Sequence, residues 1–311
     1  MNFHEKKFIN LAILLALALS ISAGVYLIYR AWDYWSADQA YADMEEKAVH
    51  KVKAAEQTDR YSGEIMSDDN YGMTSEDGLD DGTAGSDCTD EERRKSTYED
   101  DRDRTIDGIA IPEKPAIDWV ELSKSGKDIV AWIDIPALGI AYPIVQGDDN
   151  EFYLHHLPNG EYKNAGSLFM ETANSPDLTD INTIIYGHNM DNGSMFGKFR
   201  NMTEEDYETQ PFLWLCTKEK DCLYKMISLH ISHVDDESYT LFKSNEEVNL
   251  LNYENSIVTG WLRAENQRSY IRMHVPTSAL GRVITLSTCA SLSDERRVLQ
   301  AVLVREIARP P

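Results

Sequence analysis

The sequence feature that most constrains this chain is an uncharged stretch near its N-terminus. Residues 8–29 contain no Asp, Glu, Lys or Arg and consist mainly of Leu, Ala and Ile. A helix rises about 1.5 Å per residue, so a stretch of this length covers the ~30 Å hydrocarbon core of a bilayer. We therefore predict one membrane-spanning helix over residues 8–29, which makes the membrane a partner of the chain.

The charges around this stretch predict its orientation. Lys6 and Lys7 precede it, whereas Arg30 is soon followed by Asp33. Because basic residues stay on the cytoplasmic side, residues 1–7 are predicted to be a cytoplasmic tail and everything after the span to lie outside the cell. A cleaved signal peptide is the alternative, with Ala-Leu-Ala at 16–18 as its small-residue site. The apolar run continues well past that site, which favours an uncleaved single-pass anchor in the cell membrane.

An acidic segment follows, over residues 30–105. From residue 31 onward it holds 22 acidic and 9 basic residues, a net charge of −13 out of −23 for the whole chain. Its first part, residues 37–57, shows some helical periodicity, whereas residues 67–103 are rich in Asp, Gly, Ser and Thr. We predict a largely disordered extracellular stalk. Its scattered aspartates lack the ligand order of a calcium loop, and the acidic balance excludes nucleic acid as a partner.

A folded catalytic domain is predicted over residues 106–311. A short amphipathic helix begins it at residue 117, and eight runs rich in strand-forming residues follow. Helical patterns lie near residues 197–201 and in an insertion at residues 245–262. Strands without regularly alternating helices favour a mainly β fold, an eight-stranded β-barrel with an N-terminal helix and a helical insertion before the last two strands. The runs are 130–135, 142–145, 167–170, 183–186, 212–216, 222–233, 283–288 and 298–304.

Two of these strands end in residues suited to covalent catalysis. Cys289 closes the run Thr285-Leu286-Ser287-Thr288-Cys289, and His188 closes an apolar run that ends Tyr186-Gly187-His188. A cysteine can serve as a nucleophile when a histidine exchanges its proton, and a nearby arginine can stabilise the developing negative charge. Arg296 and Arg297 follow shortly after the cysteine. These residues predict an acyl-transfer site, although a lone cysteine is more often a small buried hydrophobe.

The chain resembles the sortases, the membrane-anchored cysteine transpeptidases of Gram-positive surfaces, over roughly residues 117–307. The motifs that carry the resemblance include the Tyr-Gly-His-Asn-Met sequence at 186–190 and the Thr-Leu-Ser-Thr-Cys sequence at 285–289. The segment at 192–197, the helix at 117–125 and the insertion before the cysteine strand resemble class B. The segments at 128–136, 142–146 and 165–170 also carry the general resemblance to sortases.

The resemblance implies a reaction, a substrate and an acceptor. Cys289 is implied as the nucleophile, His188 as the acid and base, and Arg296 as the anion-stabilising residue, with no cofactor and no metal. Surface proteins bearing a C-terminal sorting motif of the Asn-Pro-x-Thr-x type are the implied substrates, cleaved after Thr through a thioester. The acceptor is then an amine of a peptidoglycan precursor or of a pilin subunit, so wall anchoring and pilus polymerisation stay open.

Strand parity distinguishes the two adjacent arginines. Arg297 shares its strand face with the apolar residues at 299, 301 and 303, a series suited to a barrel interior. Arg296 shares a mixed face with residues 298, 300 and 302, which suits an outer groove. The family's arginine is also typically followed five positions later by a small residue, and Ala301 meets that pattern. We therefore predict Arg296, with Arg297 as the alternative because the loop after Cys289 is short.

Several other interpretations stay open at this stage. An inactive sortase-like peptide-binding module would keep the barrel without an activated thiol, and a plain cysteine protease would use water in place of an amine. Cys216 and Cys222 flank a predicted hairpin turn and are candidates for a cross-strand disulfide. The paired histidines at 155–156 and those at 230 and 233 lack a recognised zinc-ligand pattern, which favours ordinary side chains.

Overall fold

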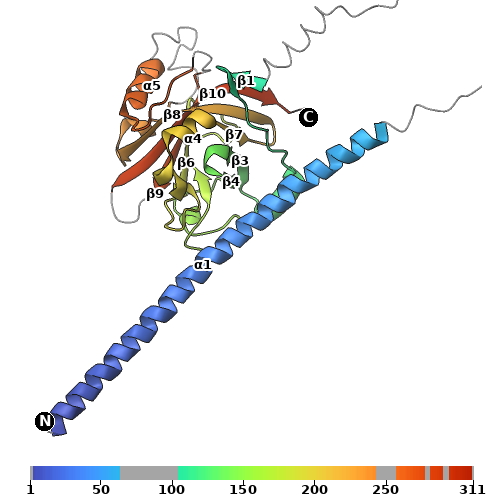
Figure 1. Cartoon of the computed structure of the whole chain (residues 1–311). Helices are drawn as coiled ribbons and strands as arrows, with labels where there is room; N and C mark the ends of the chain where they lie inside the picture. Colours follow the sequence, from blue (N-terminus) through green and yellow to red (C-terminus); the bar gives the residue numbers. More distant parts are fainter. Residues whose placement is uncertain (1–2, 64–103, 243–256, 277–280, 290–293, 310–311) are drawn as a thin grey trace, which may run out of the picture.

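The computed structural model describes residues 3–63, 104–242, 257–276, 281–289 and 294–309. A long N-terminal helix runs past a β-barrel, as Figure 1 shows. The elements are, in order, α1 (Phe3–Gly63), β1 (Thr105–Ile106), β2 (Ile109–Ala110), α3 (Trp119–Leu122), η1 (Ser123–Ser125), β3 (Ile129–Ile135), η2 (Pro136–Leu138), β4 (Ile140–Val145), η3 (Phe152–Leu154), β5 (Leu168–Met170), β6 (Asn182–His188), η4 (Phe196–Asn201), α4 (Glu204–Thr209), β7 (Phe212–Cys216), β8 (Lys220–His233), η5 (Glu237–Tyr239), α5 (Ile257–Arg268), β9 (Val283–Cys289) and β10 (Glu295–Ala308).

The barrel is closed, with strand order β10-β8-β7-β3-β4-β5-β6-β9. Most neighbours are antiparallel, but β4 pairs with β5 and β6 pairs with β9 in parallel. The eight strands predicted from the sequence are confirmed, and several extend a few residues further, most of all the last one. Closing the sheet leaves no edge strand in the barrel to pair with another chain.

Alternation along the strands builds the barrel core. Ala131, Ile133 and Ile135 of β3 belong to a large buried cluster to which all eight barrel strands contribute, whereas Trp132 belongs to a second cluster. The three residues that share a face with Arg297, at positions 299, 301 and 303, also lie in the large cluster. Successive side chains of a strand point to opposite faces, so this cluster is the barrel interior.

The predicted helices are confirmed where the structure describes them. Asp118 caps α3 by accepting a hydrogen bond from the backbone N–H of Glu121, and η1 continues this short helix to Ser125. The predicted helix near 197–201 is the 3-10 helix η4. In the insertion, α5 begins at Ile257 and ends later than predicted, while residues 245–256 lie outside the described residues.

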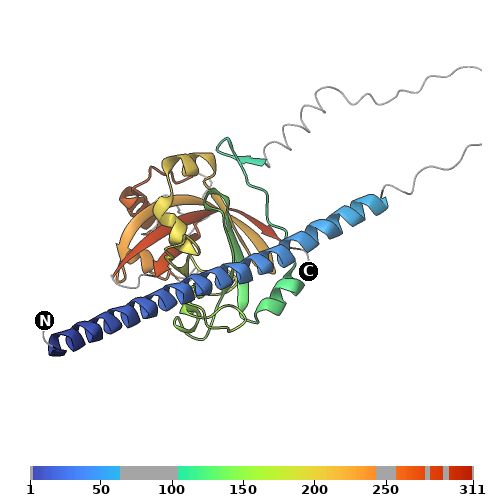
Figure 2. The same cartoon turned by 60° about the horizontal axis from the view of Figure 1, so that its bottom comes forward.

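The N-terminal helix is longer than the predicted span. None of its apolar window is buried, and Figures 1 and 2 both show its N-terminal end extending beyond the barrel. The same helix continues into the predicted stalk, where Ala37, Tyr41, Met44 and Ala48 are buried against the barrel. Part of the predicted stalk is therefore ordered and packs on the domain. Residues 67–103, to which the prediction of disorder applied, lie outside the described residues.

The candidate disulfide between Cys216 and Cys222, left open by the sequence, does not form. Cys216 and Cys222 lie on either side of the turn that joins β7 to β8, and both are free and buried. Cys216 is paired with Asp221 and Cys222 with Leu215, so the two cysteines are one position out of register. Their side chains consequently lie on opposite faces of the sheet, one in each buried cluster. Burial raises the pKa of Cys222 to about 12, so this thiol stays protonated and unreactive.

Candidate active site

The parallel strands β6 and β9 bring the two predicted catalytic positions together. The register pairs His188 with Cys289 at the C-terminal ends of both strands. Gly187 precedes the histidine because the strand packs closely there: a Cβ atom at this position would lie 2.3 Å from Leu168 Cδ2. The Tyr-Gly-His sequence therefore provides close packing at the glycine and a reactive side chain next to it.

His188 is held by the turn η3. Its Nε2 lies 2.6 Å from the carbonyl oxygen of Leu154, and its ring stacks on that of His155 with centroids 5.6 Å apart. A carbonyl only accepts hydrogen bonds, so Nε2 carries the proton and Nδ1 is the nitrogen that can take up another. Burial lowers the pKa of His188, the bond to Leu154 opposes this shift, and the neighbouring His155 adds to it. The neutral ring is therefore favoured.

A cavity of about 340 Å³ opens beside this pair. Tyr186 and Ser287 form the register pair two positions before His188 and Cys289, and both line the cavity. Tyr239 also lines it, with its hydroxyl 2.7 Å from Ser287 Oγ. The remaining lining residues are Asn150, Leu154, Phe169, Val234 and Arg296. The mixture of aromatic, amide and cationic groups suits a peptide ligand.

The two candidate arginines have different surroundings. Arg296 lines the cavity, opposite Ser232 in the β10–β8 register. The side chain of Arg297 instead bonds to the hydroxyl of Tyr270 and helps to limit the rise that burial causes in the pKa of this tyrosine. Parity thus separated the two residues, and of the pair it is Arg296 that faces the cavity.

A carboxylate supports one wall of the cavity. Glu171 accepts hydrogen bonds from Asn150 Nδ2 at 2.8 Å and from the hydroxyl of Tyr186 at 3.0 Å. Burial alone would raise the pKa of Glu171, but these bonds and one from the backbone of Ala173 outweigh it and hold the pKa below its ordinary value. The ionised Glu171 therefore fixes two residues that line the cavity.

Comparison with known proteins decides the family. Residues 133–304, more than half of the chain, match the sortase domain. The chain belongs to the sortase family. It is 33% identical over 190 residues to the sortase B of Listeria monocytogenes, covering 59% of this chain and 73% of the relative. It is 28% identical over 178 residues to that of Staphylococcus aureus, covering 56% of this chain and 68% of the relative.

Solved structures agree with this assignment. The sortase B from B. anthracis in complex with AAEK1 matches with a TM-score of 0.51 and 28% identity, over 69% of this chain and 97% of that one. The Staphylococcus aureus sortase B-substrate complex matches with a TM-score of 0.51 and 26% identity, over 60% and 84%. The protein is thus a sortase B-type cysteine transpeptidase, and its barrel is the sortase fold.

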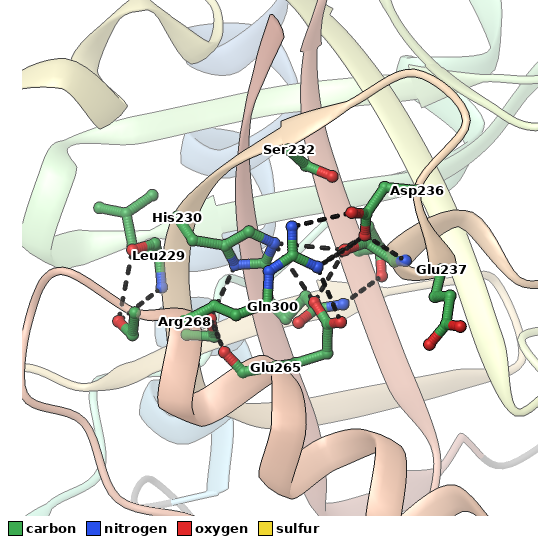
Figure 3. A network of polar contacts seen from close by, with 12 residues as sticks. Leu229, His230, Ser232, Asp236, Glu237, Glu265, Arg268 and Gln300 are labelled. Carbon is green, nitrogen blue, oxygen red and sulfur yellow. Dashed lines mark hydrogen bonds and ion pairs between the residues drawn. The ribbon is translucent and has the colours of Figure 1, made fainter.

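In this sortase a polar network with a buried centre at His230, Ser238 and Glu265 holds the turn η5. Figure 3 shows this network around His230, Asp236, Glu265 and Arg268. Ser238, the residue before Tyr239, donates a hydrogen bond to Glu265 of α5 at 2.8 Å. Arg268, one helical turn further, forms a fork on Asp236 with distances of 2.6 and 2.9 Å. His230 of β8 lies 3.2 Å from the Glu265 carboxylate. The insertion therefore supports one wall of the cavity.

Sequence reasoning missed several residues of this site. The carbonyl of Leu154 left no signal in the sequence, because every residue has the same backbone carbonyl acceptor whatever its side chain. The sequence favoured ordinary side chains for His155 and His230, and the residues that the structure describes contain no group of three or more His, Cys, Asp or Glu that could hold a metal. Their roles here are stacking on His188 and membership of the buried network. Tyr239 had one available signal: the resemblance to class B implies that residues 238–279 help to form the substrate groove, and Tyr239 lies in that range.

Proposed function

We propose that this sortase cleaves a C-terminal sorting motif of the Asn-Pro-x-Thr-x type after its threonine and transfers the protein to an amine. Cys289, His188 and Arg296 are the proposed catalytic residues. The observation that carries the proposal is the pairing of His188 with Cys289 beside a cavity lined by Arg296. The solved sortase B-substrate complex of Staphylococcus aureus, with which the chain shares its fold, supports a substrate-binding role for this barrel.

The first half of the reaction forms a thioester. The thiolate of Cys289 attacks the threonine carbonyl, and the guanidinium of Arg296 donates to the developing oxyanion. The C–N bond then breaks, and His188 gives its proton to the departing amine. The neutral His188 that burial favours must therefore acquire this proton first, at Nδ1, from the thiol of Cys289. Thiol and imidazole thus exchange one proton before the attack.

The second half resolves the thioester. An amine of a peptidoglycan precursor or of another surface protein attacks the carbonyl, His188 accepts the proton, and the C–S bond breaks to restore the cysteine. The buried network behind Tyr239 keeps the cavity wall fixed while donor and acceptor are exchanged. No step requires a group beyond the chain and its two substrates.

We also propose a membrane location for the reaction. The unburied apolar part of α1 is suited to span the bilayer, with residues 1–7 in the cytoplasm and the barrel outside the cell. In this arrangement residues 30–105 connect the span to the catalytic domain at 106–311. Part of α1 packs on the barrel, so the domain stands close to the outer bilayer surface.

A cleavage screen tests substrate and acceptor together. The full chain in detergent is incubated with pentapeptides of the Asn-Pro-x-Thr-x type and with unrelated pentapeptides, each with and without candidate amines. We expect cleavage after Thr, with amine-dependent formation of the transfer product. Cleavage to free acid alone, unchanged by amines, would indicate a cysteine protease. Binding without cleavage would indicate an inactive module.

A further inference from the structure

We propose that the juxtamembrane part of α1 positions His188, and that Tyr41 is the principal positioning residue. The inference rests on the proposed role of His188 and adds a function for a helix that the sequence predicted to belong to a spacer. Tyr41 is only 4% exposed, although it lies in the acidic segment after the membrane span. Its hydroxyl donates a hydrogen bond of 2.6 Å to the carbonyl of Gly166 and lies 3.1 Å from Ser167 Oγ.

A chain of contacts leads from Tyr41 to the histidine. Gly166 has φ of +54°, and a Cβ there would lie 2.2 Å from the carbonyl oxygen of Leu154. That oxygen is the acceptor for His188 Nε2. Ser167 strengthens the same contact, because its N–H donates to the carbonyl of Tyr153 at 2.9 Å. The helix therefore fixes the backbone segment that selects the His188 tautomer.

A second set of contacts reaches the segment after His188. Asn192 donates a hydrogen bond of 3.0 Å to the carboxylate of Asp38 on α1. Met195 ends the loop with φ of 53°, a strained conformation for a residue with a side chain. The ring of Tyr41 packs edge-on against Tyr142, whose hydroxyl accepts from the Met195 N–H at 3.4 Å. The segment at residues 166–167, which packs against the His188 acceptor, and the loop that follows His188 thus both contact one turn of α1.

The burial of this helix face shows that the contact is an integral part of the domain. Ala37, Tyr41 and Met44 lie in the same cluster as the barrel interior. Asp33, which is 2% exposed, accepts hydrogen bonds from the backbone and side chain of Asn164 at 3.2 and 2.8 Å. A buried carboxylate is costly unless it is hydrogen-bonded, so these contacts oppose sliding of α1 along the barrel surface.

The test uses Tyr41→Phe in the full chain in detergent, with Gln39→Ala on the exposed face of the same helix turn as the control. Phenylalanine keeps the ring packing and loses the hydroxyl. We expect the single-turnover acylation rate to fall about tenfold, the effect of one lost hydrogen bond, with an unchanged rate in the control. The ring ¹⁵N shifts of His188 should change from a single Nε2–H tautomer to a mixture.

Two further outcomes keep the test decisive. Wild-type acylation together with a single Nε2–H tautomer in Tyr41→Phe would overturn the proposal, as would an equal loss in Gln39→Ala. If Tyr41→Phe does not fold, Asp38→Asn is the second variant, because Asp38 contacts Asn192 in the loop that follows His188. An unchanged His188 tautomer and an unchanged acylation rate in this variant would again count against positioning. The ¹⁵N measurement needs no substrate. If the wild type forms no thioester, the proposed function fails while the tautomer still tests the positioning.

Discussion

His188 and Cys289 are register partners at the end of the parallel pair formed by β6 and β9. The two residues are 101 positions apart in the sequence and become neighbours only because β6 and β9 lie side by side in the closed barrel. A parallel pair places the C-terminal ends of both strands at the same edge. The proposed nucleophile and the proposed proton carrier therefore both lie at the ends of barrel strands.

The two arginines should differ in their effect on acylation. Arg296→Lys keeps the charge but loses the planar fork, and should lower the single-turnover acylation rate on the order of a hundredfold if one oxyanion donor is lost. Arg297→Lys is the matched control, since the side chain of Arg297 bonds to Tyr270 away from the cavity. The opposite order of rates would assign the anion-stabilising role to Arg297.

The buried network should affect substrate binding more than chemistry. Arg268→Lys loses the two-pronged contact with Asp236 that holds the turn before Tyr239. We expect KM for a cleaved peptide to rise several-fold with kcat little changed, because the wall contacts ground state and transition state alike. Arg263→Lys, on an exposed position of α5, is the control. A fall in kcat at constant KM would show that the network acts on the chemical step instead.

His230 should make the domain less stable in acid. Burial, followed by the positive charge of Arg268, lowers its pKa to about 4, whereas a histidine in the unfolded chain titrates near 6.5. Stability is therefore complete above pH 6.5 and is lost as the pH falls toward 4, by about 3 kcal/mol over the whole window. The free energy of unfolding, measured with denaturant at several pH values, should fall more steeply with decreasing pH in the wild type than in His230→Gln across this range.

Glu265 contributes in the opposite direction to this pH dependence. Burial raises the pKa of Glu265, so protonating it costs the folded state less than the unfolded chain and stability is regained as the pH falls. The comparison with His230→Gln isolates the histidine, since both proteins keep Glu265. Equal slopes for the two proteins between pH 6.5 and 4 would contradict the assignment.

The two parts of the predicted stalk should differ in their effect on stability. Met44→Ala removes a side chain that is 6% exposed and should lower the free energy of unfolding by about 2 kcal/mol or more. Deletion of residues 67–103 should leave the melting temperature and peptide cleavage in detergent nearly unchanged, because this segment has few apolar side chains to bury. A large loss on deletion would mean that the segment docks on the barrel.

The sequence predicted those features that depend on local pattern. Runs rich in strand-forming residues identified the eight strands, and alternation placed Arg296 and Arg297 on opposite faces of the last one. The histidine and the cysteine were recognisable because each closes a predicted strand. A closed barrel follows from many short strands, and the structure confirms it.

Other features depend on contacts that leave no local pattern. Leu154 acts through its carbonyl, and Tyr41 meets Gly166 across 125 residues. The four-residue spacing of Ala40, Met44, Ala48 and Val52 predicts some helical periodicity, but the surrounding acidic charge suggested a solvated spacer. Whether Cys216 and Cys222 could form a disulfide depended on the register of the hairpin. In the structure the two cysteines are offset by one position, so their side chains lie on opposite faces of the sheet.

Trapping the acyl-enzyme tests the central claim most directly. The full chain is mixed with an Asn-Pro-x-Thr-x peptide without an amine, quenched in acid, digested and analysed by mass spectrometry. We predict a thioester of the peptide, truncated after Thr, on Cys289, and its absence from Cys289→Ala and His188→Ala variants that remain folded. An adduct on Cys88, Cys216 or Cys222, or cleavage by folded Cys289→Ala, would contradict the account.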